Sequence, residues 1–221
     1  MSVPKPARRR TYLKADDRRA QILDVAKGVF AQRGYRVANV ADICAAARIG
    51  RGTLYQYFEN KQAVLLAVME ELAARVKRVL ENRPKVASIS HARHAPVEMI
   101  VEFCQTRLRA LLDAVFVDES ALRLILREAR GLDGTVDRVI ATIDELLFAA
   151  LETDLRAAQK AGVLRSGDAR LMARYILGGV EKMVLTALAG DEKIDLDEIV
   201  QVAVQLELFG LLHPQVRKEV R

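Results

Sequence analysis

The sequence lacks several features on which whole classes of protein depend. Tryptophan is absent and only two of the 221 residues are cysteine, so a disulfide framework is not expected. No apolar run approaches the roughly 20 residues that a membrane helix needs, and the basic start MSVPKPARRR is not followed by the apolar segment of a secretory signal. These absences predict a cytoplasmic protein that does not enter the membrane, with Cys44 and Cys104 reduced.

Proline is rare as well, and the sequence has no convincing alternation of apolar and polar residues with hairpin signals. Long stretches rich in Ala, Leu, Val, Glu and Arg instead repeat their apolar residues at helical spacing. The sequence therefore predicts an all-α protein. We expect nine helices at about 17–33, 40–47, 51–58, 61–82, 97–116, 119–130, 135–161, 169–189 and 196–212.

The side chains that an enzyme needs are also scarce. Of the three histidines, His91 and His94 share one loop and His213 lies beside a proline, and no Gly-rich phosphate loop is present. A metal site at His91 and His94 lacks a nearby Cys, Asp or Glu in the loop, so solvated histidines are the favoured interpretation. We expect neither an enzyme, nor a metal, nor a cofactor.

Positive charge is concentrated in the N-terminal part of the chain. Residues 1–61 hold 13 Lys and Arg against 5 Asp and Glu, whereas residues 62–221 hold 22 against 24. A basic excess of this kind neutralises phosphates when a protein binds DNA, although a soluble basic face is an equally good explanation of the charge alone.

Residues 39–61, NVADICAAARIGRGTLYQYFENK, predict two short helices joined by a tight turn. Asn39 can cap the first helix with its side-chain oxygen, and Asp42 places negative charge in the first turn, where the helix dipole favours it. Residues 47–50, Ala-Arg-Ile-Gly, form the turn. This arrangement fits the helix-turn-helix unit, whose second helix enters the major groove of DNA.

The second helix of this unit begins near Arg51 and is expected to bury Leu54 and Phe58, which are four residues apart. The remaining side chains then lie on its outer surface, and they are Arg51, Thr53, Tyr55, Gln56 and Tyr57. They offer a cation, hydroxyl groups and an amide, with no carboxylate before Glu59, which suits contact with DNA.

The run GTLYQYFENK, residues 52–61, resembles the end of the helix-turn-helix in transcriptional regulators of the TetR/AcrR family. The run AQILDVAKGVFAQRGY, residues 20–35, is similar to the first helix of that family. Two residues depart from the family pattern: Arg48 stands where a turn glycine is usual, and Gly50 stands where a capping Ser or Thr is frequent. A slightly costlier turn is expected, since residues other than glycine are strained at positive φ.

Chemistry and matching family positions together suggest roles for the residues of this unit. Arg51 and Gln56 are the expected readers of base edges, because Arg pairs with guanine and Gln with adenine. Thr53 and Tyr55 are expected to contact bases or phosphates, whereas Tyr57, Lys61 and Asn39 are expected to hold phosphates. The complete candidate set is Asn39, Arg48, Arg51, Gly52, Thr53, Tyr55, Gln56, Tyr57 and Lys61.

The resemblance implies a basic arm (1–15), a helix-turn-helix domain (16–61) and a helical effector-binding and dimerisation domain (62–221). The arm either contacts DNA or is a solubilising tail, and the sequence leaves both open. In the family the last two helices form a four-helix bundle with a second subunit. The small pair Gly178-Gly179 is compatible with that, but intramolecular packing explains the same pattern.

The resemblance also implies an inducer cavity among residues 97–190. Candidate lining residues are Met99, Phe103, Arg107, Phe116, Arg127, Phe148, Tyr175 and Met183. Core packing explains the apolar ones as well, and a surface pair with Glu128 explains Arg127. The expected function is a ligand-responsive transcriptional regulator, a repressor that binds a palindromic operator as a homodimer and is released by a small, hydrophobic inducer. The alternative is a DNA-binding regulator or adaptor without an inducer.

Overall fold

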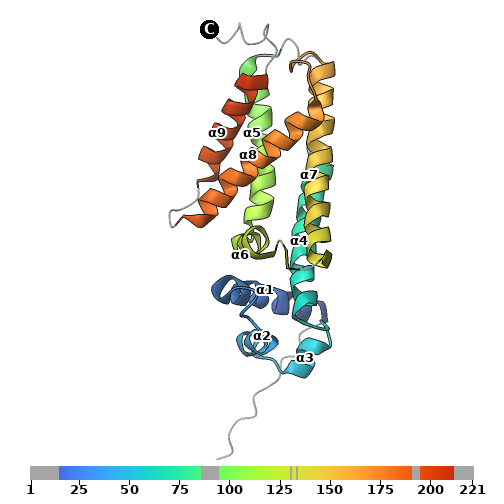
Figure 1. Cartoon of the computed structure of the whole chain (residues 1–221), viewed down its shortest axis with the longest axis vertical. Coiled ribbons are helices and arrows are strands. Elements are labelled where there is room, and N and C mark those ends of the chain that lie inside the picture. Colours follow the sequence, from blue (N-terminus) through green and yellow to red (C-terminus); the bar gives the residue numbers. More distant parts are fainter. Residues whose placement is uncertain (1–14, 86–94, 130, 133, 191–194, 212–221) are drawn as a thin grey trace, which may run out of the picture. The chain divides into compact units, whose positions relative to one another are not determined.

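The computed structural model describes residues 15–85, 95–129, 131–132, 134–190 and 195–211, except for the side chains of Arg127, Glu128, Phe209 and Leu211. The expectations for the N-terminal arm and for His91, His94 and His213 therefore lie outside the described residues. Over the residues described, the chain forms nine α-helices and no strand, which confirms the all-α class (Figure 1).

The chain divides into two compact units, Met1–Ala67 and Val68–Arg221, so the division falls within α4 (Lys61–Asn82). The sequence had suggested a boundary at the start of this helix. The first unit contains α1 (Ala15–Arg33), α2 (Val40–Ala47), α3 (Arg51–Tyr55) and the beginning of α4.

The first unit is held together by a small apolar core. Its most deeply buried side chains come from all of its helices and include Ile22, Leu23, Phe30, Ile43, Leu54, Val64 and Leu65. Gly34 ends α1 at φ 77°, and the ring of Tyr35 then packs edge-on against Phe30, with ring centroids 5.3 Å apart. Val37, in the turn that follows Gly34, does not cover this core: it is 73 % exposed.

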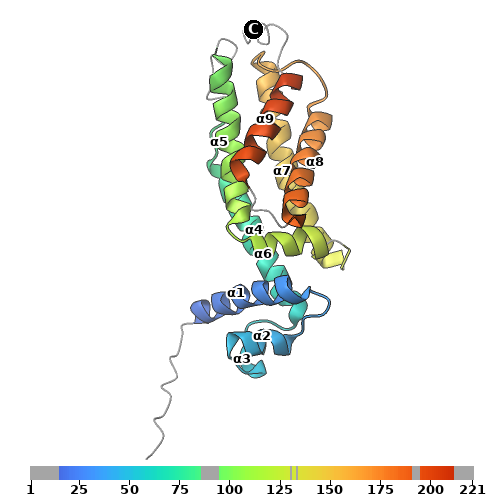
Figure 2. The same cartoon turned by 90° about the vertical axis from the view of Figure 1, so that its left-hand side faces the viewer.

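The second unit contains the rest of α4 and five more α-helices: α5 (Val97–Phe116), α6 (Glu119–Leu124), α7 (Gly134–Lys160), α8 (Ala169–Ala189) and α9 (Leu196–Leu211). Helix α5 packs against α9, α7 packs against α8, and α8 also contacts α9 (Figures 1 and 2). The expected helix at 119–130 is α-helical for only six residues and continues as a π-helical turn, Ile125–Ala129.

Capping groups explain where three helices of the second unit begin. Asp118 accepts a hydrogen bond from Ala121 N (3.0 Å), Asp168 from Arg170 N (2.9 Å) and Asp195 from Asp197 N (2.9 Å). Gly131 (φ 76°) and Gly162 (φ 74°) lie in the connections before and after α7 and adopt the left-handed conformation that ends helices. None of the helices in the described ranges is both long and apolar enough to span a bilayer.

Candidate DNA-binding surface and ligand cavity

Helix α2 begins with the cap that the sequence predicts. Asn39 Oδ1 accepts a hydrogen bond from Asp42 N (3.1 Å), and Asp42 Oδ2 accepts one from Asn39 N (2.9 Å), so the two residues form a complete capping box. Arg33 Nη1 lies 2.7 Å from Asp42 Oδ1 and ties α1 to the same cap. The entry to the helix-turn-helix is therefore held by side chains from both helices.

The turn after α2 has the strained geometry that the departure from the family pattern implies. Arg48 adopts φ 54° and ψ 44°, and it is the one residue other than glycine at positive φ in the described part of the chain. Its N–H donates to Ala45 O at 3.2 Å, which closes the helix end, while its side chain remains exposed. Gly50 precedes α3 and provides no side-chain hydrogen bond, as expected.

Helix α3 is shorter than expected, because its regular part ends at Tyr55. The following turn stays close to helical: Phe58 N donates to Leu54 O at 3.0 Å. Leu54 and Phe58 are buried, as the sequence predicts. The outward side carries the expected residues, with Arg51, Gly52, Tyr55 and Gln56 exposed and Thr53 and Tyr57 half-buried.

Lys61 has an internal role that the sequence did not reveal. Its ammonium group donates to three backbone carbonyl oxygens, those of Tyr35 (2.6 Å), Arg36 (3.4 Å) and Ala38 (2.7 Å), and lies 4.3 Å from the centroid of the Tyr35 ring. A lysine ammonium has three N–H donors, so these contacts occupy all of them. The start of α4 is thereby tied to the connection between α1 and α2.

We predict that Lys61→Met lowers the free energy of unfolding of the protein by about 2 kcal/mol, because the charge-assisted hydrogen bonds of the ammonium are lost. Chemical denaturation measures this effect, and Lys77→Met, at an exposed position of the same helix, is the matched control. The salt dependence of DNA binding should stay unchanged. A decrease in its slope by about one with normal stability would restore Lys61 as a phosphate contact.

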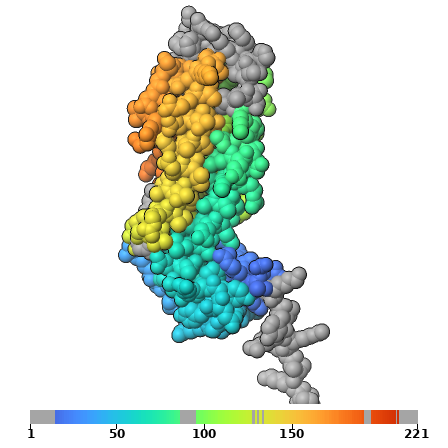
Figure 3. Space-filling view, turned by 90° about the vertical axis from the view of Figure 1, so that its right-hand side faces the viewer, coloured from blue at the N-terminus to red at the C-terminus, as the bar shows by residue number. Residues whose placement is uncertain are grey.

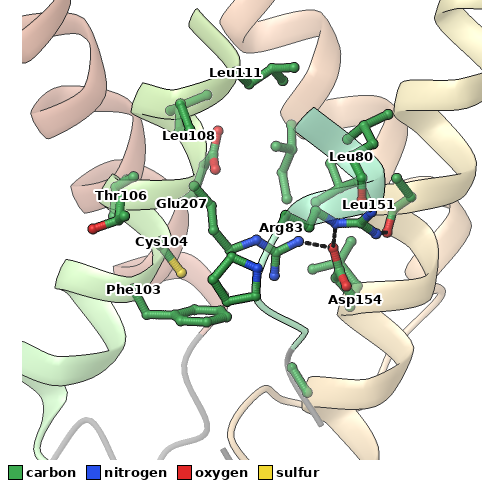
Figure 4. A pocket seen from close by; sticks show the side chains of 18 of the residues that line it. Leu80, Arg83, Phe103, Cys104, Thr106, Leu108, Leu111, Leu151, Asp154 and Glu207 are labelled. Atoms are coloured by element: carbon green, nitrogen blue, oxygen red, sulfur yellow. Dashed lines mark hydrogen bonds and ion pairs between the residues drawn. The ribbon is translucent and has the colours of Figure 1, made fainter. Parts of the chain in front are cut away.

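A cavity of about 450 Å³ lies within the second unit. The end of α4 and helices α5, α7, α8 and α9 contribute its walls, which are mostly apolar (Figure 4). On the face shown in Figure 3, the yellow-to-orange α7 lies beside the C-terminal part of α4. The polar side chains that line the cavity are Asn82, Arg83, Cys104, Thr106, Arg107, Asp154 and Glu207.

Two arginines and one carboxylate form a cluster on one wall of the cavity. Asp154 Oδ2 accepts from Arg83 Nε at 3.2 Å and also from Arg107 Nη2. Arg83 further donates to the carbonyl oxygens of Leu80 and Ala150, so each of its three nitrogens is engaged. Arg107 has only the bond to Asp154 among the described residues, and its guanidinium lies 5.1 Å from the Phe103 ring centroid.

Glu207 enters the cavity from α9 and differs from the other polar groups. It has no hydrogen bond or ion pair within the described part of the chain, and burial raises its pKa to about 7. Burial also raises the pKa of the nearby Cys104 to about 11, an effect that the charges of Glu207 and Asp154 strengthen and Arg107 opposes. Cys104 therefore remains a neutral thiol at neutral pH.

The candidate ligand residues from the sequence are dispersed. Phe103 and Arg107 line the cavity, and with Met99 they line a smaller hollow of about 280 Å³. The others lie elsewhere: Phe116 and Met183 pack half-buried against the core, Phe148 lies under the guanidinium groups of Arg170 and Arg174, Tyr175 is 80 % exposed, and the Arg127 side chain is outside the described residues. Helical periodicity identifies faces of a helix but does not reveal which face meets a cavity.

The sequence interpretation missed Arg83, Asp154 and Glu207. A signal for Glu207 was present, because Val200, Val204 and Leu208 form the buried stripe of α9 and Glu207 falls beside it at helical spacing. Arg83 and Asp154 come from distant parts of the chain, and nothing local indicates that they meet. In the described residues no group of His, Cys, Asp and Glu could hold a metal ion.

Comparison with known proteins agrees with this organisation. Residues 22–68 match the model of the bacterial regulatory proteins of the tetR family. The fatty acid metabolism regulator protein of Bacillus subtilis is 25 % identical over 86 % of this chain and 94 % of its own length. The transcriptional activator FasR of Mycolicibacterium smegmatis is 28 % identical over 93 % of this chain and 88 % of its own.

A solved structure has the same fold. It is the crystal structure of the regulator FadR from Bacillus subtilis in complex with stearoyl-CoA, which superimposes with a TM-score of 0.69 at 23 % identity over 88 % of this chain and 99 % of that chain. The match of the DNA-binding segment, the relatives along most of the chain and the common fold lead to one conclusion. Residues 22–68 are a DNA-binding segment of the tetR family, and along most of its length the chain is similar to TetR/AcrR transcriptional regulators and has their fold.

Proposed function

We propose that this protein is a homodimeric repressor that binds a palindromic operator through α2 and α3 and is released by an apolar ligand in the cavity. The observation that carries the proposal is that α3 and the turn after it have one buried, apolar side and one exposed, polar side. Leu54 and Phe58 are buried, whereas Arg51, Tyr55 and Gln56 are presented to solvent. Exposed Arg and Gln on a short helix after a turn are suited to reading base edges.

The remaining candidate residues support contact with the DNA backbone. Arg48 is exposed in the turn, and Thr53 and Tyr57 are half-buried at the edges of the outward side. A Cβ at Gly52 would meet no atom of the protein within 4 Å, so packing within the chain does not require glycine there. Close approach of the backbone to DNA would explain it. Asn39 and Lys61 act chiefly through the cap and the carbonyl contacts described above.

The cavity supports the ligand-responsive part of the proposal. Its volume of about 450 Å³ and its apolar walls with a few polar groups are typical of small-molecule sites. The FadR relative holds stearoyl-CoA, so this fold can accommodate a ligand with a long apolar chain. We infer that the ligand of this protein also has a largely apolar body.

The homodimer rests on an apolar surface that the single chain leaves uncovered. Tyr175 and Leu171 are exposed four residues apart on α8, and Leu206 and Val202 are exposed four residues apart on α9. A Cβ added at Gly178 or Gly179 would meet nothing within 4 Å, which leaves room for another helix. Since α8 and α9 contact each other, these residues define a joint surface, here called the α8–α9 face. A second copy of the chain would bury it.

Helix α4 supplies a path from the cavity to the DNA-binding unit. It belongs to both units: Val79 and Leu80 near its end line the cavity, and Lys61 at its beginning is tied to the connection between α1 and α2. A ligand that favours one position of α4 would shift the population of operator-competent dimers. Such coupling is commonly about 1–3 kcal/mol and cannot exceed the difference in ligand affinity between the two states.

Filling the cavity should remove the ligand response. Leu151 lines the cavity from α7, and Leu151→Trp replaces its side chain with a bulky indole ring. We expect ligand affinity to fall at least about tenfold, because the indole would occupy volume that the ligand needs. Operator binding without ligand should persist. Calorimetric titration and an operator-release assay measure the two properties, and unchanged ligand release in this variant would show that the inducer binds elsewhere.

Selection of bound duplexes from a random DNA pool, at a stated salt concentration, tests the DNA-binding part directly. We expect a palindromic motif with half-sites about 34–36 Å apart, or a multiple of that spacing. Weak binding to every duplex with no preferred site would refute the proposal. Because the relative FasR is named an activator, a reporter gene behind the selected operator should be measured for both repression and activation.

The alternative is a regulator that has no inducer. A thermal-shift screen of apolar compounds separates the two, because a ligand that binds the folded protein raises its melting temperature. Compounds that both stabilise the protein and release DNA support the ligand-responsive regulator. A screen without such compounds favours the alternative.

A further inference from the structure

Glu207 is a carboxyl group that has no partner among the described residues, and it lies in a cavity whose walls are mostly apolar. The groups on the neighbouring elements are Cys104, Thr106 and Arg107 on α5, Asp154 on α7, Arg83 after α4, and only the apolar Ile176, Leu177 and Val180 on α8. None of them forms a hydrogen bond or ion pair with Glu207. Figure 4 shows Glu207 directed into the same space as Cys104, Phe103 and Leu108.

Neither Arg83 nor Arg107 forms an ion pair with the Glu207 carboxyl. Both donate to Asp154, and Arg83 also donates to two carbonyl oxygens, so neither is hydrogen-bonded to Glu207. Burial alone accounts for the raised pKa of Glu207, with no opposing contribution from a cation. The ionised form of such a half-buried carboxyl without a cationic partner is stabilised by any molecule that brings a positive charge and an N–H donor into the cavity.

We propose that Glu207 binds the head group of the ligand and that this ligand joins an apolar body to a protonated amine. This inference rests on the proposed ligand-responsive function and narrows its ligand class. An ammonium N–H would donate to the Glu207 carboxylate while the apolar body occupies the space between α5, α7 and α8. Both groups would then be paired in a cavity whose walls are mostly apolar.

Other head groups fit this place less well. A carboxylate would add negative charge beside Glu207 once that group is ionised, and an alcohol would form only a neutral hydrogen bond. The competing anchor is Arg107, which retains unused N–H donors and would instead favour an anionic head group. Three probes that share the same alkyl chain length but differ in their head group therefore distinguish Glu207 from Arg107 as the binding residue. They are decylamine, decanol and decanoic acid.

The test is calorimetric titration of the full-length protein with these probes, below the concentrations at which they aggregate, between about pH 6 and pH 8.5. Ionised Glu207 is the binding form, so decylamine affinity should rise up to about tenfold per pH unit below pH 7 and level off above it. Decylamine should bind at least about tenfold more tightly than decanol near pH 8. At about pH 6, binding should release close to one proton, which titrations in buffers of different ionisation enthalpy detect.

Glu207→Gln is the decisive variant, and Glu198→Gln, at an exposed position of α9, is the matched control. Glu207→Gln should lose the pH dependence and the preference for decylamine over decanol, while Glu198→Gln keeps both. Chemical denaturation shows whether the variant is folded. A carboxyl with a raised folded-state pKa binds more protons folded than unfolded, so wild-type stability falls relative to the variant as pH rises from about 5 to 8.

Two results would overturn the inference. One is decylamine binding that Glu207→Gln leaves unchanged, and the other is tightest binding of decanoic acid. Both leave the proposed function standing if decanol still binds and a ligand still releases operator DNA. If decylamine binds at Glu207 but no ligand changes DNA binding, the regulatory proposal is refuted and the assignment of the head group to Glu207 remains.

Discussion

Leu206→Glu is expected to convert the protein to a monomer and to lower its operator affinity at least about a hundredfold, because a monomer contacts one half-site only. Leu206 is 72 % exposed on α9, and Tyr175 on α8 is 80 % exposed, although both are large and apolar. In an isologous interface each substitution appears twice. Two carboxylates without a partner would therefore be buried in the dimer interface. Each such charge costs about 3–5 kcal/mol of association free energy.

Sedimentation velocity measures the oligomeric state, and titration of the selected operator measures affinity. Val117→Glu is the control, since Val117 is also exposed and apolar but lies beyond the end of α5, outside the α8–α9 face. It should leave both quantities unchanged. A Leu206→Glu protein that remains dimeric with full operator affinity would show that another surface joins the subunits.

Arg51→Ala should reduce affinity for the preferred operator by about 1–3 kcal/mol and relax sequence preference at one base pair of each half-site. Arg51 begins α3 and is exposed, while Leu54 on the same helix is buried, so the orientation of this helix is set by its inward side. The loss is expected to be specific because an arginine that pairs bidentately with guanine discriminates against the other bases.

Binding to a panel of single-base operator variants measures this effect. Arg78→Ala removes the same charge from an exposed position of α4 and should leave the sequence preference intact. Equal weakening on every operator, with a salt slope lowered by about one, would assign Arg51 to phosphate contact instead. Gln56→Ala is then the next variant in the search for the base-reading residue.

The helix-turn-helix was accessible from the sequence because local signals determine it. Asn39 and Asp42 are three residues apart and form the cap that their spacing predicts. The spacing of Leu54 and Phe58 predicts their burial correctly, and the strained position falls at Arg48 as the missing glycine implies. Helix ends were also well predicted where a glycine or capping residue marks them. The wider π-helical turn after α6 had no such mark.

Local chemistry was less informative about side chains whose partners are distant in the chain. Lys61 resembles a phosphate contact in the sequence, yet its ammonium is engaged by carbonyl groups more than twenty residues earlier. Asp154 meets Arg83 and Arg107 across separations of 71 and 47 residues. Only the packing of the helices brings these groups together.

What the sequence determined by itself is therefore the all-α class, the positions of the helices and the outward side of α3, since capping, helical periodicity and turn geometry act over a few residues. The tertiary structure decided where the cavity lies, which polar groups line it and that Glu207 has no partner there among the residues described. Those properties depend on the mutual positions of helices α4, α5, α7, α8 and α9, and periodicity along one helix carries no information about its neighbours.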